Sequence, residues 1–259
     1  MNDSSDLNRR LREYGVVPVI VLSDPDQAEP LGEALLAGGL PVAEITFRSD
    51  AALEGIRTMA RVYPQILLGA GTVLSVDQAK AAADAGATFI VTPGFSAAVV
   101  DHCIDTGMPI YPGISGTGEI EAALARGLEV VKFFPAEALG GVSMLKALSG
   151  PYRNLSFMPT GGISLANIHD YLALPHVVAC GGSWLVSKEA LAARDYTTIV
   201  TAVRETLREI YGCVVAGETI EVRGRYPART RAYLERSDVA FTETDEGVEI
   251  RGKSVILRG

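Results

Sequence analysis

The stretch VAEITFRSDAALEGIRTMARVYPQILLGAGTVLSVDQAKAAADAGATFIV (42–91) decides the fold class. It contains three short apolar runs, VAEITF (42–47), ILLGA (66–70) and TFIV (88–91), and the two segments between them are of helical length and rich in alanine. Strands that alternate with helices pair in parallel through right-handed crossovers. Strands with apolar residues on both faces are typical of sheets covered by helices. The stretch therefore predicts an α/β protein with a parallel sheet.

The same alternation extends from Val16 to about Tyr211. Five more apolar runs complete the pattern: VVPVIVL (16–22), MPIY (108–111), VVKFF (130–134), LSFMP (155–159) and VVAC (177–180). Eight such units, spaced by roughly 25 residues, predict a (β/α)8 TIM barrel over residues 1–211. A helix from about Asp6 to Tyr14 precedes the first strand. The competing fold is an open doubly wound sheet, but no G-x-G-x-x-G opens the first unit to support its dinucleotide-binding form.

Residues 212–259 have a different composition and predict a small α+β appendage with a βαβββ-like order. The expected elements are a strand TIEVRG (219–224), a helix PARTRAYLERS (227–237), and the strands VAFTET (239–244), GVEIRG (247–252) and KSVILRG (253–259). Eight basic and eight acidic residues cancel in this segment, so residues 1–211 carry the whole net charge of −8. A segment this short is near the lower limit for independent folding. We therefore expect it to pack on the barrel or on a neighbouring subunit.

Composition narrows the class of protein. The 259 residues are 48% hydrophobic and 21% charged, which excludes wholesale disorder. The first residues, MNDSSDLNRR, lack the apolar core of a signal peptide, and no apolar stretch is long enough to span a membrane. The acidic balance argues against nucleic acid as a partner. A cytoplasmic protein is expected, with isolated cysteines at Cys103, Cys180 and Cys213.

The three histidines, His102, His169 and His176, have none of the spacings typical of a metal site. Metal-dependent hydrolysis is therefore disfavoured, while a magnesium ion bound by carboxylates remains open.

Polar residues at the carboxyl ends of the predicted strands are the candidates for chemistry, because that end of a barrel carries the active site. Lys132 interrupts the apolar strand VVKFFP. A buried ammonium is costly unless it is paired, and burial favours the neutral amine that forms a Schiff base. The structural alternative is a lysine that pairs with a carboxylate or extends past the strand end.

Glu44 and Arg48 are four residues apart on the second predicted strand, so both side chains face the barrel mouth. A carboxylate beside an amine can transfer protons, and an arginine can hold a substrate carboxylate with two hydrogen bonds. A simple ion pair between the two is the alternative. Thr72, Pro93 and Pro112-Gly113 follow the next three strands; they suit ordinary turns, although Thr72 could add a hydroxyl to the carboxylate site.

Two glycine pairs follow the last two predicted strands, in Thr160-Gly161-Gly162 and in Gly181-Gly182-Ser183. These are the positions at which barrels often bind phosphate, because glycine lets backbone N–H groups approach an anion. The combined set predicts a phosphate at one side, a carboxylate clamp at the other, and a buried amine between them. That arrangement suits a phosphorylated 2-oxo acid that reacts through an imine.

On these residues the chain resembles the bacterial 2-keto-3-deoxy-6-phosphogluconate (KDPG) and 4-hydroxy-2-oxoglutarate (KHG) aldolases, which are class I aldolases. The resemblance covers about Val16 to Ile210. It rests on PVIV (18–21), EITFR (44–48), GAGTVL (69–74), TPG (92–94), PGIS (112–115), KFFPAE (132–137), PTGGIS (159–164), DYLAL (170–174) and GGSWLV (181–186). It implies a (β/α)8 barrel, a homotrimer, and a reaction that needs no metal or other cofactor.

The resemblance also implies roles for individual residues. Lys132 forms the Schiff base and Glu44 handles protons. The other implied contacts are Arg48 and Thr72 with the pyruvyl carboxylate, Pro93 and Phe134 beside the imine, Thr160 with substrate hydroxyls, and Gly161, Gly162 and Ser183 with the phosphate.

The expected reaction is reversible cleavage of KDPG to pyruvate and D-glyceraldehyde 3-phosphate, with KHG as a further substrate. Three alternatives stay open. They are an aldolase for the galactonate epimer of KDPG, a non-catalytic phosphosugar-binding barrel, and a magnesium-dependent transferase similar to thiamine phosphate synthase. The family's usual chain ends near Leu207 to Tyr211, so residues 212–259 are an addition to it.

Overall fold

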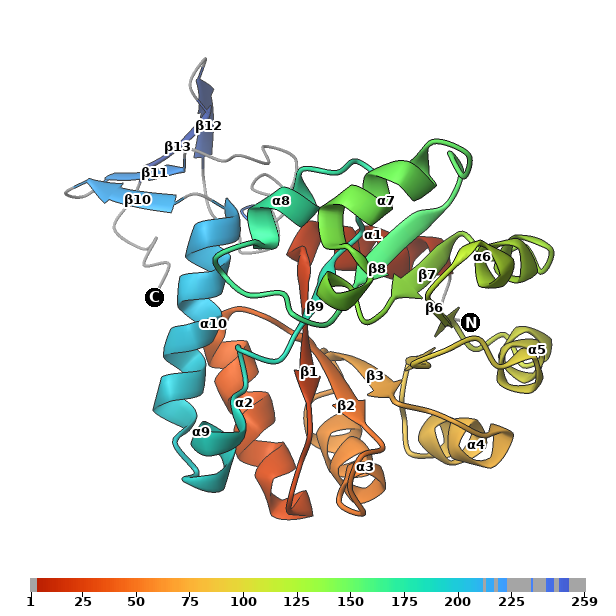
Figure 1. Ribbon diagram of the computed structural model, residues 1–259. Helices are drawn as coiled ribbons and strands as arrows, with labels where there is room; N and C mark the ends of the chain where they lie inside the picture. Colours follow the sequence, from red (N-terminus) through yellow and green to blue (C-terminus); the bar gives the residue numbers. More distant parts are fainter. Residues whose placement is uncertain are drawn as a thin grey trace.

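The structure is a computed structural model that describes residues 4–211, 213–216, 219–222, 234, 241–244 and 247–251. Its body is an α/β assembly of parallel strands with helices on their outer side (Figure 1). The parallel strands are β1 (Val16–Ile20), β2 (Val42–Thr46), β3 (Leu67–Gly71), β4 (Phe89–Val91), β5 (Ile110–Tyr111), β6 (Gly113–Ile114), β7 (Val130–Phe133), β8 (Ser156–Pro159) and β9 (Cys180–Gly182). The α/β class predicted from the alternating pattern is confirmed.

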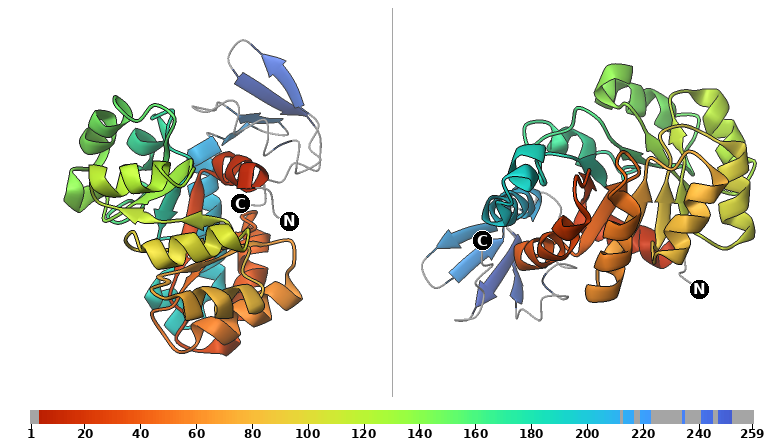
Figure 2. Two further views of the ribbon diagram at one scale, coloured as in Figure 1. Left: turned by 90° about the vertical axis from the view of Figure 1, so that its right-hand side faces the viewer. Right: turned by 90° about the horizontal axis from the view of Figure 1, so that it is seen from below.

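The helices follow the strands in the expected alternation. The α-helices are α1 (Ser4–Tyr14), α2 (Ala28–Gly38), α3 (Ala52–Val62), α4 (Val76–Asp84), α5 (Ala97–Asp105), α6 (Thr117–Leu124), α7 (Gly141–Ser149), α8 (Ile168–Leu172), α9 (Lys188–Ala192) and α10 (Tyr196–Tyr211). Short 3-10 helices occupy Pro25–Gln27 and Glu137–Leu139. Viewed from below, the helices lie around the curled strands (Figure 2).

The parallel strands form two sheets. One contains six strands in the order β5-β4-β3-β2-β1-β9, and the other contains three in the order β6-β7-β8. The fifth predicted strand, MPIY (108–111), is present only as Ile110–Tyr111, and Pro112-Gly113, predicted as a turn, leads into a further strand, β6, that was not predicted. The two strands are separate because proline has no N–H to donate to a ladder. The chain crosses from the first sheet to the second at this residue, whose carbonyl still accepts a hydrogen bond of 2.8 Å from the Lys132 N–H.

The last parallel strand differs from its predicted position. We expected VVAC (177–180) with Gly181-Gly182 in the following loop, but β9 begins at Cys180 and includes both glycines. The displacement follows from pairing: Val16, Val17 and Pro18 of β1 lie opposite Cys180, Gly181 and Gly182. Isolated parallel bridges, Phe157 with Val177 and Thr160 with Gly181, connect β8 to this segment.

Helix α1 covers the amino-terminal ends of the strands. Its Arg12 donates hydrogen bonds to the carbonyl of Pro175 at 3.1 Å and to the hydroxyl of Ser156 at 3.3 Å, and its Asn8 accepts one of 2.7 Å from the Tyr111 hydroxyl. The predicted N-terminal helix is thus present. Because α1 closes this end, the carboxyl ends of the strands are the open side for substrate.

Beyond α10, the described residues form a four-stranded antiparallel sheet in the order β10-β11-β13-β12 (Figure 1). The strands are β10 (Cys213–Ala216), β11 (Thr219–Val222), β12 (Phe241–Thr244) and β13 (Gly247–Arg251). Strand β10 was not predicted, and it pairs with β11 along their full length. The predicted helix 227–237, apart from Leu234, and the predicted strand 253–259 lie outside the described residues. No helix in the described part of the chain is long and apolar enough to cross a membrane.

Close packing of α2 against the end of α3 gives a first prediction. A Cβ added at Gly32 would lie 2.3 Å from Cδ2 of Tyr63, whereas one at Gly118 in α6 would meet no atom within 4 Å. Both glycines are helical, so alanine brings each about the same gain in helix propensity, roughly 0.5–1 kcal/mol. Overpacking costs about 1–3 kcal/mol. In thermal unfolding, Gly32→Ala is expected to lower Tm, while the control Gly118→Ala leaves it equal or higher. Equal Tm values for the two variants would contradict the packing.

Candidate active site

Lys132 lies in the middle of β7, between the buried residues Val131 and Phe133. Side chains alternate along a strand, so the lysine and its two neighbours point to opposite faces. Its side chain is only 6% exposed. The strand therefore places an amine in the interior, as the interruption of VVKFFP predicted.

Glu44 is fully buried on β2, and its Oε1 lies 3.3 Å from Nζ of Lys132. These strands belong to different sheets, so the pair joins the six-stranded sheet to the three-stranded one across the interior. Among the described residues, Glu44 Oε2 has no hydrogen-bond partner. Buried polar atoms are nearly always paired, which makes this oxygen a position for substrate or water.

Gly71 creates the space that Glu44 occupies. A Cβ at this position would lie 2.2 Å from Glu44 Oε1 and 2.7 Å from its Cγ. Because the neighbouring strand β3 ends in a residue without a side chain, the carboxylate lies directly over its backbone. The glycine of GAGT therefore determines where the carboxylate sits.

Thr72, the next residue, has φ of +55°. A β-branched residue in the left-handed region is a true outlier, and such strain persists where the surroundings fix it. The strand β3 ends immediately before it, and the side chain is half-buried. Thr72 was predicted as a hydroxyl that contacts the substrate carboxylate, but nothing in the sequence indicated its strained backbone.

Arg48 lies beyond the end of β2 with an exposed side chain, and it makes no ion pair with Glu44. Its Nε instead donates a hydrogen bond of 3.1 Å to Oγ1 of Thr46. Thr46 is fully buried and donates in turn to the carbonyl of Ile20 at 2.7 Å. Sequence reasoning missed Thr46, although its place midway between Glu44 and Arg48, on the same face, could have indicated it.

Phe134 and Pro93 are both half-buried near the carboxyl ends of their strands. The Phe134 ring centroid lies 5.4 Å from Nζ of Lys132, a distance at which a ring face attracts a cation. Pro93 follows Thr92, whose hydroxyl donates to the carbonyl of Gly94 at 2.7 Å and accepts from the N–H of Gly113 at 3.2 Å. These bonds fix the turn after β4 against the start of β6.

Thr160 follows β8, and its Oγ1 is a second buried polar atom without a partner among the described residues. A Cβ at Gly181 would lie 2.2 Å from this Oγ1, and one at Gly182 would lie 1.9 Å from the ring of Trp184. Gly181 and Gly182 are therefore required by packing inside β9 and do not form the loop that we predicted. Ser183, directly after them, is exposed.

Gly161 and Gly162 form the predicted loop, with φ of +101° and +80°. Hydrogen bonds of 2.8 and 3.1 Å connect Ala136 N–H to the Thr160 carbonyl and Glu137 N–H to the Gly161 carbonyl. The segment after Lys132 is thus paired with this loop.

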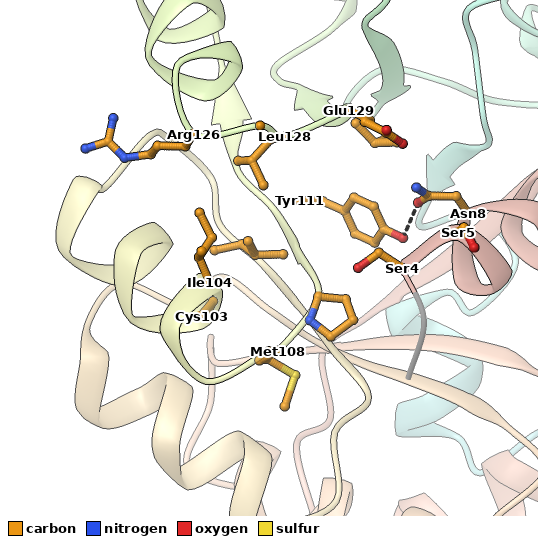
Figure 3. A pocket seen from close by; sticks show the side chains of 15 residues that line it. Ser4, Ser5, Asn8, Cys103, Ile104, Met108, Tyr111, Arg126, Leu128 and Glu129 are labelled. Carbon is orange, nitrogen blue, oxygen red and sulfur yellow. Dashed lines mark hydrogen bonds between the residues drawn. The ribbon is translucent and has the colours of Figure 1, made fainter. Parts of the chain in front are cut away.

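A separate cavity of about 420 Å³ lies at the opposite end of the strands, between α1 and the ends of α5 and α6 (Figure 3). None of the predicted site residues lines it. Cys103 on its wall is buried, and burial raises the pKa of the thiol to about 11, so the thiol is protonated near neutral pH. This cavity does not contribute to the site around Lys132.

An amine and a carboxylate held together out of water can exchange a proton, and the neutral amine is then a nucleophile for a carbonyl carbon. Within the described ranges, no group of three or more His, Cys, Asp or Glu side chains is arranged to hold a metal ion. The residues that the structure brings together are Lys132, Glu44 and Phe134, and Arg48 makes its side-chain hydrogen bond to Thr46.

Known proteins are similar to this chain in sequence and in fold. The family model described as KDPG and KHG aldolase matches residues 7–202. The 2-dehydro-3-deoxy-phosphogluconate aldolase of Haemophilus influenzae is 50% identical over 198 residues, which are 76% of this chain and 93% of that protein.

Two solved structures are similar as well. KDPG aldolase from Legionella pneumophila, with pyruvate captured as a covalent carbinolamine, superposes with a TM-score of 0.75 at 37% identity, covering 77% of this chain and 97% of that one. The enzyme of Zymomonas mobilis with 3-phosphoglycerate has a TM-score of 0.74 at 36% identity and covers 79% and 96%. The chain belongs to the KDPG and KHG aldolase family.

Proposed function

We propose that this protein is a class I aldolase that reversibly cleaves KDPG to pyruvate and D-glyceraldehyde 3-phosphate. The observation that carries the proposal is the buried Lys132 amine at 3.3 Å from the Glu44 carboxylate. Family membership supports it, as does the capture of pyruvate as a covalent carbinolamine by the Legionella relative.

The first half of the reaction makes the imine. Lys132 passes a proton to Glu44 and attacks C2 of the keto acid through its nitrogen lone pair. A second proton then moves from the nitrogen to the former carbonyl oxygen, directly or through a water, which gives a neutral carbinolamine. Glu44 returns the proton to the C2 hydroxyl, which leaves as water and yields the iminium. The positive charge then lies near the Glu44 carboxylate and the face of Phe134, and both stabilise it.

The second half breaks the C3–C4 bond. A base removes the proton of the C4 hydroxyl, the C4 oxygen forms the aldehyde carbonyl, and the electron pair of the C3–C4 bond moves to C3 and into the iminium as an enamine. Glu44 Oε2, which has no partner among the described residues, can accept that proton directly or through a water. Protonation of C3 and hydrolysis of the imine then release pyruvate and regenerate Lys132.

The remaining residues bind the substrate along its length. Arg48 and Thr72 hold the carboxylate, and Pro93 and Phe134 form the wall beside the imine. Thr160 offers the hydroxyl Oγ1 to the sugar hydroxyls. Gly161, Gly162 and Ser183 are proposed to form the phosphate end, because successive backbone N–H groups in a turn with positive φ, as at these two glycines, can bind an anion.

The preference for KDPG over its galactonate epimer rests on the Thr160 hydroxyl, a hydrogen-bonding group where an apolar side chain would offer none. KHG is a second proposed substrate, cleaved to pyruvate and glyoxylate by the same imine. A non-catalytic phosphosugar-binding barrel is the weaker alternative, because a buried amine paired with a carboxylate is costly to keep without a use in chemistry.

We infer further that residues 1–211 form one closed eight-stranded barrel in which β5 and β6 act as a single strand. The bridges between β8 and β9 and the ion pair between the sheets support this. We place the protein in the cytoplasm, in keeping with the free thiol of Cys103. The chain is proposed to act as a homotrimer on a small-molecule substrate, without nucleic acid or membrane partners, and residues 212–259 are proposed as an assembly or capping appendage.

Borohydride trapping tests the reaction. Incubation with pyruvate and borohydride is expected to add one reduced pyruvyl group to the intact protein, and peptide mapping should place it on Lys132. The chain has four other lysines, Lys80, Lys146, Lys188 and Lys253, so the map is unambiguous. Lys132→Ala should give no adduct, and Lys146→Ala is the matched control that keeps it. Absence of an adduct on the folded wild-type protein would favour the binding-barrel alternative.

The substitution Thr72→Gly separates the backbone strain at this residue from its proposed contact with the substrate carboxylate. Glycine adopts φ of +55° without the roughly 1–2 kcal/mol that a side chain costs there, and the entropy of its unfolded chain offsets about 0.4–1 kcal/mol of that gain. Tm is therefore expected to stay equal or rise. The KM for KDPG should rise about tenfold or more, because a hydrogen bond to a charged group is lost. Thr72→Ser, which keeps the hydroxyl, is the control, and an unchanged KM in the glycine variant would refute the proposed contact.

Ending the chain after Tyr211 tests the appendage. The full chain is expected to have the mass of three subunits in light scattering. The truncated chain should show a changed mass or a lower Tm, and it should still trap pyruvate on Lys132. A folded truncation that no longer traps pyruvate would place residues 212–259 in the active site.

A further inference from the structure

We propose that Thr46 is a positioning residue that orients Arg48 toward the substrate carboxylate. The proposal rests on the proposed aldolase function and adds to it a residue outside the predicted substrate contacts. Thr46 shares a face of β2 with Glu44, and the chain bends directly after this strand, where the Arg48 N–H donates a hydrogen bond of 2.7 Å to the Thr46 carbonyl.

The Thr46 hydroxyl both donates and accepts a hydrogen bond. It is fully buried, and its single hydrogen is directed to the carbonyl of Ile20 on β1 at 2.7 Å. A hydroxyl with its hydrogen used presents a lone pair to a donor. That lone pair accepts the hydrogen bond from Nε of Arg48 at 3.1 Å. The backbone of β1 thus determines the position of the guanidinium through one buried oxygen.

Because Arg48 bonds Thr46 through Nε, its terminal N–H groups remain for other partners. A guanidinium binds a carboxylate in a bidentate manner through two N–H groups. The bond to Thr46 uses the Nε edge and leaves the terminal nitrogens, for which the described residues supply no hydrogen bond or ion pair. The terminal N–H groups therefore remain available for a ligand.

The surroundings of Arg48 explain why its guanidinium needs a hydrogen bond to hold one orientation. The side chain is exposed, and it borders an open depression of about 440 Å³ that Asp50 and Gln78 also line. An exposed arginine has many rotamers, and the Asp50 carboxylate offers a competing partner for its charge. Without the Thr46 hydroxyl, no hydrogen bond from the described residues fixes the guanidinium at the edge of that depression.

The test compares Thr46→Val with Thr46→Ser. Valine keeps the shape and removes the hydroxyl, while serine keeps the hydroxyl and is expected to restore the wild-type behaviour. With KDPG, the valine variant should raise KM about five- to twenty-fold and change kcat less than twofold, because the lost bond acts on binding. Thr46→Ala provides the same comparison if the valine variant does not fold.

A second measurement separates positioning from a general structural defect. Imine formation on Lys132 is followed by borohydride trapping with pyruvate and with pyruvamide, which has the same ketone but no charged carboxylate. The valine variant should need about five- to twenty-fold more pyruvate for half-maximal trapping and the wild-type concentration of pyruvamide. Equal losses for both ligands, or no loss for either, would overturn the proposal.

A double-mutant cycle completes the test. If Thr46 acts through Arg48, the effect of Thr46→Val on pyruvate trapping should largely disappear in an Arg48→Lys background. Full additivity would overturn the proposal. Failure of the wild-type protein to trap pyruvate is a separate result, since that outcome rejects the aldolase function and leaves the Thr46 hydrogen bonds unexplained.

Discussion

An ammonium and a carboxylate removed from water must neutralise each other, and this requirement controls the arrangement of the site. Lys132 and Glu44 come from different sheets and meet across 3.3 Å in the interior. Removing one partner from such a pair costs about 3–5 kcal/mol, because the other charge stays buried. Together with the bridges between β8 and the segment of β9, the pair joins the two sheets, and it does so through the same atoms that we propose to react.

Space around the pair comes from residues without side chains. Gly71 lets Glu44 lie over the end of β3, and Gly181 does the same for Thr160 over β9. In each case a glycine on a neighbouring strand leaves a space that the polar side chain occupies. Glu44 Oε2 and Thr160 Oγ1, which belong to these two groups, are both buried without a hydrogen-bond partner in the described part of the chain. The glycines thus direct unsatisfied polar atoms to the place where a substrate would satisfy them.

Much of this could be predicted from the sequence, because apolar runs and helical segments alternate regularly from Val16 to Tyr211. The position of Lys132 inside an apolar strand also predicted that its side chain is buried. Local patterns could not show the additional strand β6 after Pro112 or the shift of β9 onto Gly181-Gly182, since both depend on pairing between distant strands. The strain at Thr72 and the Thr46–Arg48 bond depend on three-dimensional geometry in the same way.

Glu44 carries two tasks that would conflict if one oxygen had to perform both. Oε1 faces the amine, where it can take the proton that Lys132 must lose, and it later faces the iminium charge. Oε2 is buried without a protein partner among the described residues, so the C4 hydroxyl or a water can reach it without displacing a hydrogen bond. The carboxylate can therefore balance the iminium charge until the C3–C4 bond breaks, and it can accept the C4 proton as the iminium becomes a neutral enamine. One buried residue then suffices for both halves of the reaction, because its two oxygens have different surroundings.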